Sequence, residues 1–169
     1  GSSIDVFIEV GLKRADFDYI LDQLALRSPA YMAFDFQGKT SKVVQSIVEA
    51  DYLHTYDPFT QIVIAGNGPI VPALVNLCQM LEFDLIVCSS EPETLEQIET
   101  VSDKRNLVKT GPLGGVKYDK YSGLCSVFHD HEWELELLQQ ALRSEAFYVG
   151  ALGSQRTHEL RKLKLAELG

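Results

Sequence analysis

The sequence predicts an α/β fold in which a doubly wound, mostly parallel sheet follows a small β-α-β lead-in. Two observations carry this prediction. Residues 61–65 (QIVIA) and 84–88 (DLIVC) are continuous apolar runs, which are typical of strands buried on both faces of a parallel sheet. Segments with helical spacing separate these runs from one another and from later ones, as in right-handed βαβ units.

The elements of this main domain follow in order along the chain. Leu74, Leu77 and Leu81 recur at helical spacing and predict a helix directly after the first glycine turn. The predicted strands cover residues 61–65, 84–88, 106–109, 124–128 and 147–150, and the predicted helices cover 70–81, 93–101, 134–143 and 157–168.

The first part of the chain predicts the β-α-β lead-in. Residues 4–10 (IDVFIEV) alternate as a half-buried strand does, a helical pattern follows Asp16 and stops before Pro29, and residues 31–36 favour a second strand. Residues 38–56 fit a helix by spacing and a strand by β-branching. Pro58 marks the boundary, so we expect a lead-in over 4–57 and a main domain over 58–169. Such a small lead-in must pack on the main domain or exchange with a second chain, which favours a homodimer.

Composition narrows the function classes. A formal net charge of −9 argues against a nucleic-acid surface, which needs clustered Lys and Arg. The one basic cluster, on the final helix (Arg156, Arg161, Lys162 and Lys164), is interpreted as a solvated face. No apolar run approaches the roughly 20 residues of a bilayer span, and no signal peptide is visible. Three cysteines without metal-ligand spacing indicate core positions in a protein of the reducing cytoplasm.

Three loops compete for the ligand-binding edge of the sheet. The first, Gly66-Asn67-Gly68-Pro69, resembles the start of a dinucleotide-binding fingerprint. Its third small residue is replaced by Val71, and the acidic residue expected at the end of the next strand is missing at Ser89. The loop therefore has the glycine spacing of a Rossmann turn, but it lacks the small third residue and the acidic residue that NAD(P) binding uses.

The second loop, His129-Asp130-His131, follows the strand at 124–128. Two histidines around a carboxylate could ligate a metal or carry protons, although no third ligand can be assigned by spacing. Asp130 or His131 could instead cap the following helix. We expect no metal site here, with His129 and His131 as weak candidates and His129 as a ligand-facing residue.

The third loop lies in residues 147–163 (FYVGALGSQRTHELRKL), where an apolar strand ends in a glycine turn before a charged helix. The free N–H groups and the dipole of a helix N-terminus favour an anion. Ser154 can cap the helix, whereas Arg156 in the first turn is unfavourable for the dipole and suggests another role. Gly153, Ser154 and Arg156 together suit a phosphate or a carboxylate.

Three segments, IAGNGPIVPAL, VFHDHEWE and above all FYVGALGSQRTHELRKLKLAELG, resemble the C-terminal Rossmann-like domain of the xanthine dehydrogenase accessory protein family (XdhC/CoxI). The resemblance implies a non-catalytic maturation factor for molybdenum hydroxylases. Such a protein binds molybdenum cofactor, assists its sulfuration with a cysteine desulfurase, and delivers it to the apo-enzyme. The expected cofactor-binding residues are Gly66, Asn67, Gly68, Pro69, His129, Asp130, Gly153, Ser154 and Arg156.

Two other functions remain open from the sequence. An NAD(P)-dependent oxidoreductase could be built on the Gly66 turn, and a degenerate Rossmann scaffold would have its cleft filled by Val71 or Pro72. Ser89 also stands where many members of the resembled family carry aspartate. That family's N-terminal domain and C-terminal tail are not in the sequence, so we expect either a short member or a portion of a longer protein.

Overall fold

The computed structural model describes residues 2–4, 6–10, 12–108, 115–129 and 133–168. The chain divides into two compact units, Gly1–Pro58 and Phe59–Gly169. Among the described residues, no helix has the length and apolarity that crossing a bilayer requires.

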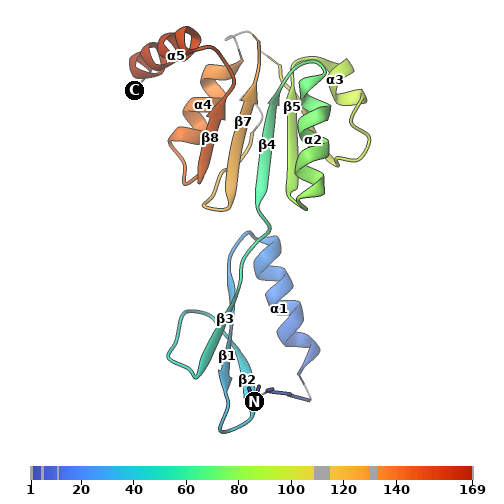
Figure 1. The fold of residues 1–169 in the computed structure, drawn as a ribbon, viewed down its shortest axis with the longest axis vertical. Coiled ribbons are helices and arrows are strands. Elements are labelled where there is room, and N and C mark those ends of the chain that lie inside the picture. The colour runs from blue at the N-terminus through green and yellow to red at the C-terminus, as the bar shows by residue number, and fades with distance from the viewer. Residues whose placement is uncertain (1, 5, 11, 109–114, 130–132, 169) are drawn as a thin grey trace. The chain divides into compact units, whose positions relative to one another are not determined.

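The first unit joins one helix to an antiparallel sheet (Figure 1). Helix α1 (Arg14–Ala25) precedes strands β1 (Ala30–Asp35), β2 (Thr40–Val44) and β3 (Tyr52–Tyr56), which are arranged in the order β2-β1-β3. Its core is small and consists of Ile20, Ala30 and Met32, with half-buried side chains around them.

The predicted helix and second strand of the lead-in are confirmed as α1 and β1, whereas the order β-α-β is wrong. The ambiguous stretch 38–56 forms β2 and β3, because a tight turn reverses the chain after β1 and the β-branched residues Val43 and Val44 then pair with it. The N–H of Gly38 donates to Asp35 Oδ1 at 2.8 Å within this turn. Tertiary pairing thus overrides the helical spacing of the segment.

The strand expected over residues 4–10 is absent from the described part of that segment, residues 4 and 6–10. Exposure does alternate along the segment, but the aliphatic residues that a half-buried strand would bury are the exposed ones. Phe7 packs edge-on against Phe34 with ring centroids 5.8 Å apart, and Glu9 accepts hydrogen bonds from Ser41, while Val6 and Ile8 are exposed. The segment is anchored by its alternate residues and adds no strand to the sheet.

The second unit is a doubly wound parallel sheet, as the sequence predicts (Figure 1). All pairs are parallel, and the strand order is β6-β5-β4-β7-β8. Its elements are β4 (Gln61–Gly66), α2 (Ile70–Met80), β5 (Asp84–Ser89), α3 (Pro92–Glu96), β6 (Asp103–Asn106), β7 (Ser122–Val127), α4 (Glu134–Leu142), β8 (Tyr148–Ala151) and α5 (Gln155–Glu167).

Two apolar cores lie on opposite faces of this sheet, because successive strand residues point to opposite sides. Ile62 and Ile64 of β4 pack with Val71 and Val75 of α2. Val63 of the same strand packs on the other face with Leu137 and its neighbours in α4. Helices on both faces explain why the central strands read as continuous apolar runs.

Two elements near β6 differ from the prediction. Helix α3 is shorter than the expected 93–101, and β6 lies three residues before the expected 106–109. Lys104 of β6 donates from Nζ to the carbonyl oxygens of Ile98 (2.9 Å) and Leu95 (3.3 Å). This lysine satisfies carbonyls just after α3 and lets the chain leave the helix early.

The strand order places a topological switch point between β4 and β7. From β4 the chain moves outward to β5 and β6, and it then returns to the other side of β4 for β7 and β8. In sheets of this kind, ligands bind outside the carboxyl ends of the strands at the switch point. We refer to this end of the sheet as the carboxyl edge.

Candidate functional site

The strand register brings the three sequence-predicted loops to the carboxyl edge. Gly66 of β4 aligns with Val127 of β7, and Ser126 of β7 aligns with Ala151 of β8. The N–H of Leu152 donates to the carbonyl of Ser126 at 2.8 Å and continues this alignment past the end of β8. Two strand spacings separate β4 from β8, about 10 Å in all, and the His129 loop starts between them.

Gly66 and Gly68 are glycines for two different reasons. A Cβ on Gly66 would lie 2.5 Å from Val127 Cγ2 and 3.0 Å from the Val127 backbone, so a side chain would separate β4 from β7. Gly68 has a φ of +74°, a conformation that other residues adopt only with strain. Gly68 thus permits a tight turn, whereas Gly66 is required by the close approach of β7.

The polar groups of the Gly66–Pro69 turn bind the end of β5, the loop after it and the start of α3. Asn67 Oδ1 accepts from the Ser89 hydroxyl at 2.8 Å, and its Nδ2 donates to the Ser90 hydroxyl at 2.9 Å. The Gly68 N–H donates to Thr94 Oγ1 at 2.9 Å. Ser89 and Thr94 are buried. Ser89 therefore fills the place of the ribose-binding acid with an internal contact, which disfavours a dinucleotide.

The next residues of this loop start helix α2. Pro69 occupies the N-cap position, where its missing N–H costs no helical hydrogen bond. Val71 is fully buried in the core between α2 and the sheet. The hypothesis of a degenerate scaffold expects Val71 to fill the ligand cleft. Its side chain lies in the core instead, so it does not obstruct a ligand.

His129 lies two residues beyond β7 and is exposed. Asp130 and His131 lie outside the described residues, so their predicted roles stay predictions. No group of three or more His, Cys, Asp or Glu side chains that could hold a metal ion occurs in the described ranges of the chain.

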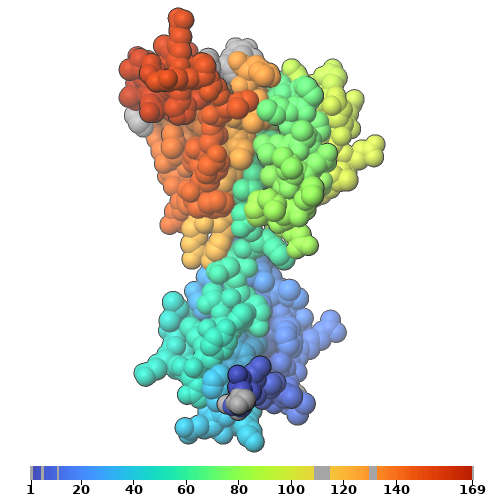
Figure 2. All heavy atoms as spheres, viewed as in Figure 1, coloured from blue at the N-terminus to red at the C-terminus, as the bar shows by residue number. Residues whose placement is uncertain are grey.

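The loop after β8 has the predicted helix cap. Ser154 is the N-cap of α5, and its Oγ accepts from the Thr157 N–H at 3.2 Å. A hollow of about 360 Å³ lies beside this cap and is lined by Ala151, Gly153, Ser154, Gln155, His158, Glu159 and Lys162. Helix α5 stands at the surface of the second unit (Figure 2).

Arg156 is exposed in the first turn of α5. Its guanidinium forms no hydrogen bond or ion pair with any other described residue. A cation at this end of a helix opposes the helix dipole, and nothing in the described structure compensates it. An anionic ligand would remove that penalty.

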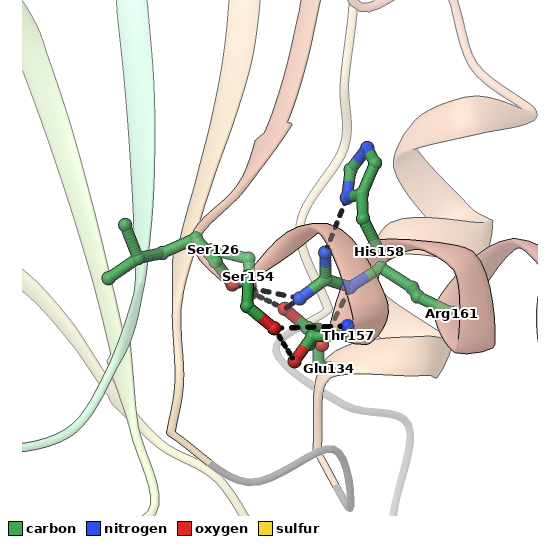
Figure 3. Close-up of polar contacts among 7 residues, drawn as sticks. Ser126, Glu134, Ser154, Thr157, His158 and Arg161 are labelled. Carbon is green, nitrogen blue, oxygen red and sulfur yellow. Dashed lines mark hydrogen bonds and ion pairs between the residues drawn. The ribbon is translucent and has the colours of Figure 1, made fainter.

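Sequence reasoning missed a buried ion pair behind this loop (Figure 3). Arg161 is 4% exposed and Glu134 is fully buried. The Arg161 guanidinium donates from Nε to Glu134 Oε2 and from Nη2 to Oε1, both at 2.9 Å. The interpretation of the basic cluster as a solvated face is thus wrong for Arg161, because its charge is needed inside the fold.

The cysteines occupy core positions, as the sequence predicts. Cys78 and Cys88 are buried, Cys125 is half-buried, and all three thiols are free. Burial raises the pKa of all three thiols, and that of Cys88 to about 11. None has the lowered pKa of a reactive thiolate.

Comparison with known proteins places this geometry in a family. Residues 62–169 match the model of the XdhC Rossmann domain. The chain is 58% identical over 155 residues to the molybdenum cofactor insertion chaperone PaoD of Escherichia coli K12, covering 89% of this chain and 43% of PaoD. A crystal structure from Bacillus halodurans, described as a xanthine dehydrogenase, superposes with a TM-score of 0.68 at 19% identity, covering 91% of this chain and 55% of the other.

The chain thus spans less than half the length of PaoD. The likeness to the Bacillus structure supports the fold, whereas the match over residues 62–169 covers the whole parallel sheet and all three loops of its carboxyl edge. This protein belongs to the XdhC Rossmann domain family.

Proposed function

We propose that this protein binds molybdenum cofactor during the maturation of a molybdenum hydroxylase and hands it to the apo-enzyme. The observation that carries the proposal is the alignment of the Gly66, His129 and Gly153 loops on one carboxyl edge at the switch point. Membership of the XdhC family and the similarity to PaoD, an insertion chaperone for this cofactor, give the ligand its chemical class.

The donor set fits a pterin that carries a phosphate. The cap of α5 and the exposed Arg156 offer hydrogen-bond donors and positive charge, which suit a phosphate. Across the edge, the space beside Gly68, where a Cβ would meet nothing within 4 Å, lets the backbone approach a flat ring system. We assign cofactor contacts to Gly66, Gly68, Pro69, His129, Asp130, Gly153, Ser154 and Arg156, and to the backbone of Asn67, whose side chain holds the neighbouring loop.

The state of the thiols bears on sulfuration. Installing a terminal sulfido ligand requires a sulfur donor, and a cysteine acts as one only through an accessible thiolate. Burial of Cys88 and Cys78 and the raised pKa of Cys125 make this chain a poor sulfur carrier. We therefore propose that sulfur comes from a partner, a cysteine desulfurase, while this protein holds the cofactor.

The partners follow from the same proposal. The acceptor is an apo molybdenum hydroxylase, and the exchange takes place in the cytoplasm. A homodimer is the proposed assembly, because the first unit exposes apolar side chains such as Val6, Ile8 and Val10 that a second chain could cover.

The test is a titration of the intact protein with molybdenum cofactor under exclusion of oxygen. Trp133, the single tryptophan, precedes α4 beside the carboxyl edge and reports binding by its fluorescence. We expect a saturable signal with one cofactor per chain and a rise in melting temperature. NAD(H) and NADP(H) serve as matched controls and should leave the melting temperature unchanged. A shift with a dinucleotide and none with the cofactor would support an oxidoreductase instead.

A further inference from the structure

The buried ion pair is built from elements on both sides of the site (Figure 3). Glu134 begins α4, directly after the loop that contains His129, and Arg161 lies in the middle of α5. Ser126 of β7 adds a third element, because its hydroxyl donates to Glu134 Oε1 at 3.1 Å. Both carboxylate oxygens are therefore engaged, and the start of α4 is joined to β7 and to α5.

Arg161 also donates to the turn after β8 and to a residue of its own helix. Its Nη2 donates to the carbonyl oxygen of Leu152 at 2.8 Å. Its Nη1 donates to His158 Nδ1 at 2.8 Å, since a guanidinium has no acceptor. A Cβ on Gly153 would lie 3.2 Å from Arg161 Nη2 and 2.9 Å from Thr157 Cγ2. Glycine at this position lets the backbone pass closely over the guanidinium.

Stability alone does not account for this arrangement. Burying two charges costs desolvation energy, and apolar side chains of similar volume often replace a buried pair without loss of stability. An apolar pair, however, could not hold a backbone carbonyl in place. The planar fork of arginine makes four hydrogen bonds from three nitrogens, to both carboxylate oxygens, to the Leu152 carbonyl and to His158, whereas a lysine has three donors on one nitrogen.

We propose that Glu134 and Arg161 are positioning residues that lock the Gly153–Arg156 turn to the start of α4. The pair sets the distance between the start of α4 and the α5 cap, which flank the proposed cofactor site. The identity of the ligand rests on the proposed function, whereas the locking of the turn does not.

The main test replaces both charges, Glu134→Leu together with Arg161→Met, in the full chain. We expect a melting temperature close to that of the wild type. We also expect faster hydrogen exchange at the amides of Leu152, Thr157 and His158, and at least about tenfold weaker binding of molybdenum cofactor. Wild-type exchange and affinity in this folded variant would overturn the proposal, because the pair would then serve packing only.

Arg161→Lys keeps the charge and gives a second test if the double variant does not fold. Lysine has three N–H donors on one nitrogen and cannot make the four hydrogen bonds of Arg161, so faster exchange of the turn and weaker binding are expected here too. Asp103→Asn, in a half-buried ion pair of β6 away from the carboxyl edge, is the matched control and should change neither. If the wild type binds no cofactor, the proposed function fails, while hydrogen exchange still decides whether the pair locks the turn.

Discussion

The two halves of the parallel sheet each carry a glycine turn that leads into a helix, and they use their polar groups in opposite ways. In the β4–β5–β6 half, Asn67 is bonded to Ser89 and Ser90 at the end of β5, and the Gly68 N–H is bonded to Thr94 of α3. In the β7–β8 half, the turn is fixed from behind by Arg161, and Arg156 and the α5 cap remain exposed.

This difference indicates which half binds the charged part of a ligand. Donors that already have protein partners add little affinity, because binding would exchange one hydrogen bond for another. Arg156 has no such partner among the described residues. We infer that the β4 turn shapes the site and that the β8 turn binds the anion.

The largest effect is expected when the buried pair is broken on one side. Arg161→Met leaves Glu134 buried without its cation, which should lower the free energy of unfolding by about 3–5 kcal/mol. Urea unfolding measures this loss. Arg156→Ala, on the same helix but exposed, should lose less than about 0.5 kcal/mol. A loss below about 1 kcal/mol in Arg161→Met would contradict the role of the pair.

An intermediate effect is expected when the hydrogen bonds of the other half are removed. Asn67→Ala leaves the buried Ser89 hydroxyl without its amide partner and should cost about 1–2 kcal/mol of stability. Its affinity for molybdenum cofactor should stay within about twofold of the wild type, because the replaced side chain contacts protein. A tenfold loss of affinity, measured by Trp133 fluorescence, would place the side chain of Asn67 in the ligand site.

The smallest effect concerns the half-buried ion pair between Asp103 and Arg105 in β6. A hydrogen bond from Arg105 lowers the pKa of the Asp103 carboxyl. The stability that this pair adds is present above the unfolded pKa of about 3.9 and is lost as the pH falls through the lower folded pKa. Since the Asp103 side chain is 42% exposed, the contribution should be at most about 1 kcal/mol.

Urea unfolding of the wild type and of Asp103→Asn checks this contribution. The two proteins should differ near neutral pH and converge once the wild-type carboxylate is protonated. A difference that persists at the lowest pH would assign the effect to something other than the charge of Asp103.

The sequence predicts the central strands well because burial on both faces leaves an unbroken apolar run. It fails in the first unit, where the alternation of residues 4–10 does not reveal which alternate set faces the sheet. Phe7 and Glu9 face protein, while the β-branched residues are exposed. Pairing between distant segments decides such cases, and no local pattern encodes it.

The ion pair was missed because its partners lie 27 residues apart. A signal is nevertheless present in each helix. Arg161 shares one stripe of α5 with Thr157 and Leu165, and Glu134 shares one with Leu137, Leu138 and Ala141. A charged residue on the buried stripe of a helix needs a buried partner. One buried stripe with a cation and another with a carboxylate, in consecutive helices, would have predicted this ion pair.

The most direct test of the account compares Arg156→Ala with Lys164→Ala in a titration with molybdenum cofactor. Both variants remove one exposed cation from α5, one in its first turn and one in its last. The account predicts that Arg156→Ala weakens binding by at least about tenfold with an unchanged melting temperature, while Lys164→Ala binds like the wild type. Equal affinities of the two variants would contradict the assignment of the anion site to the β8 turn.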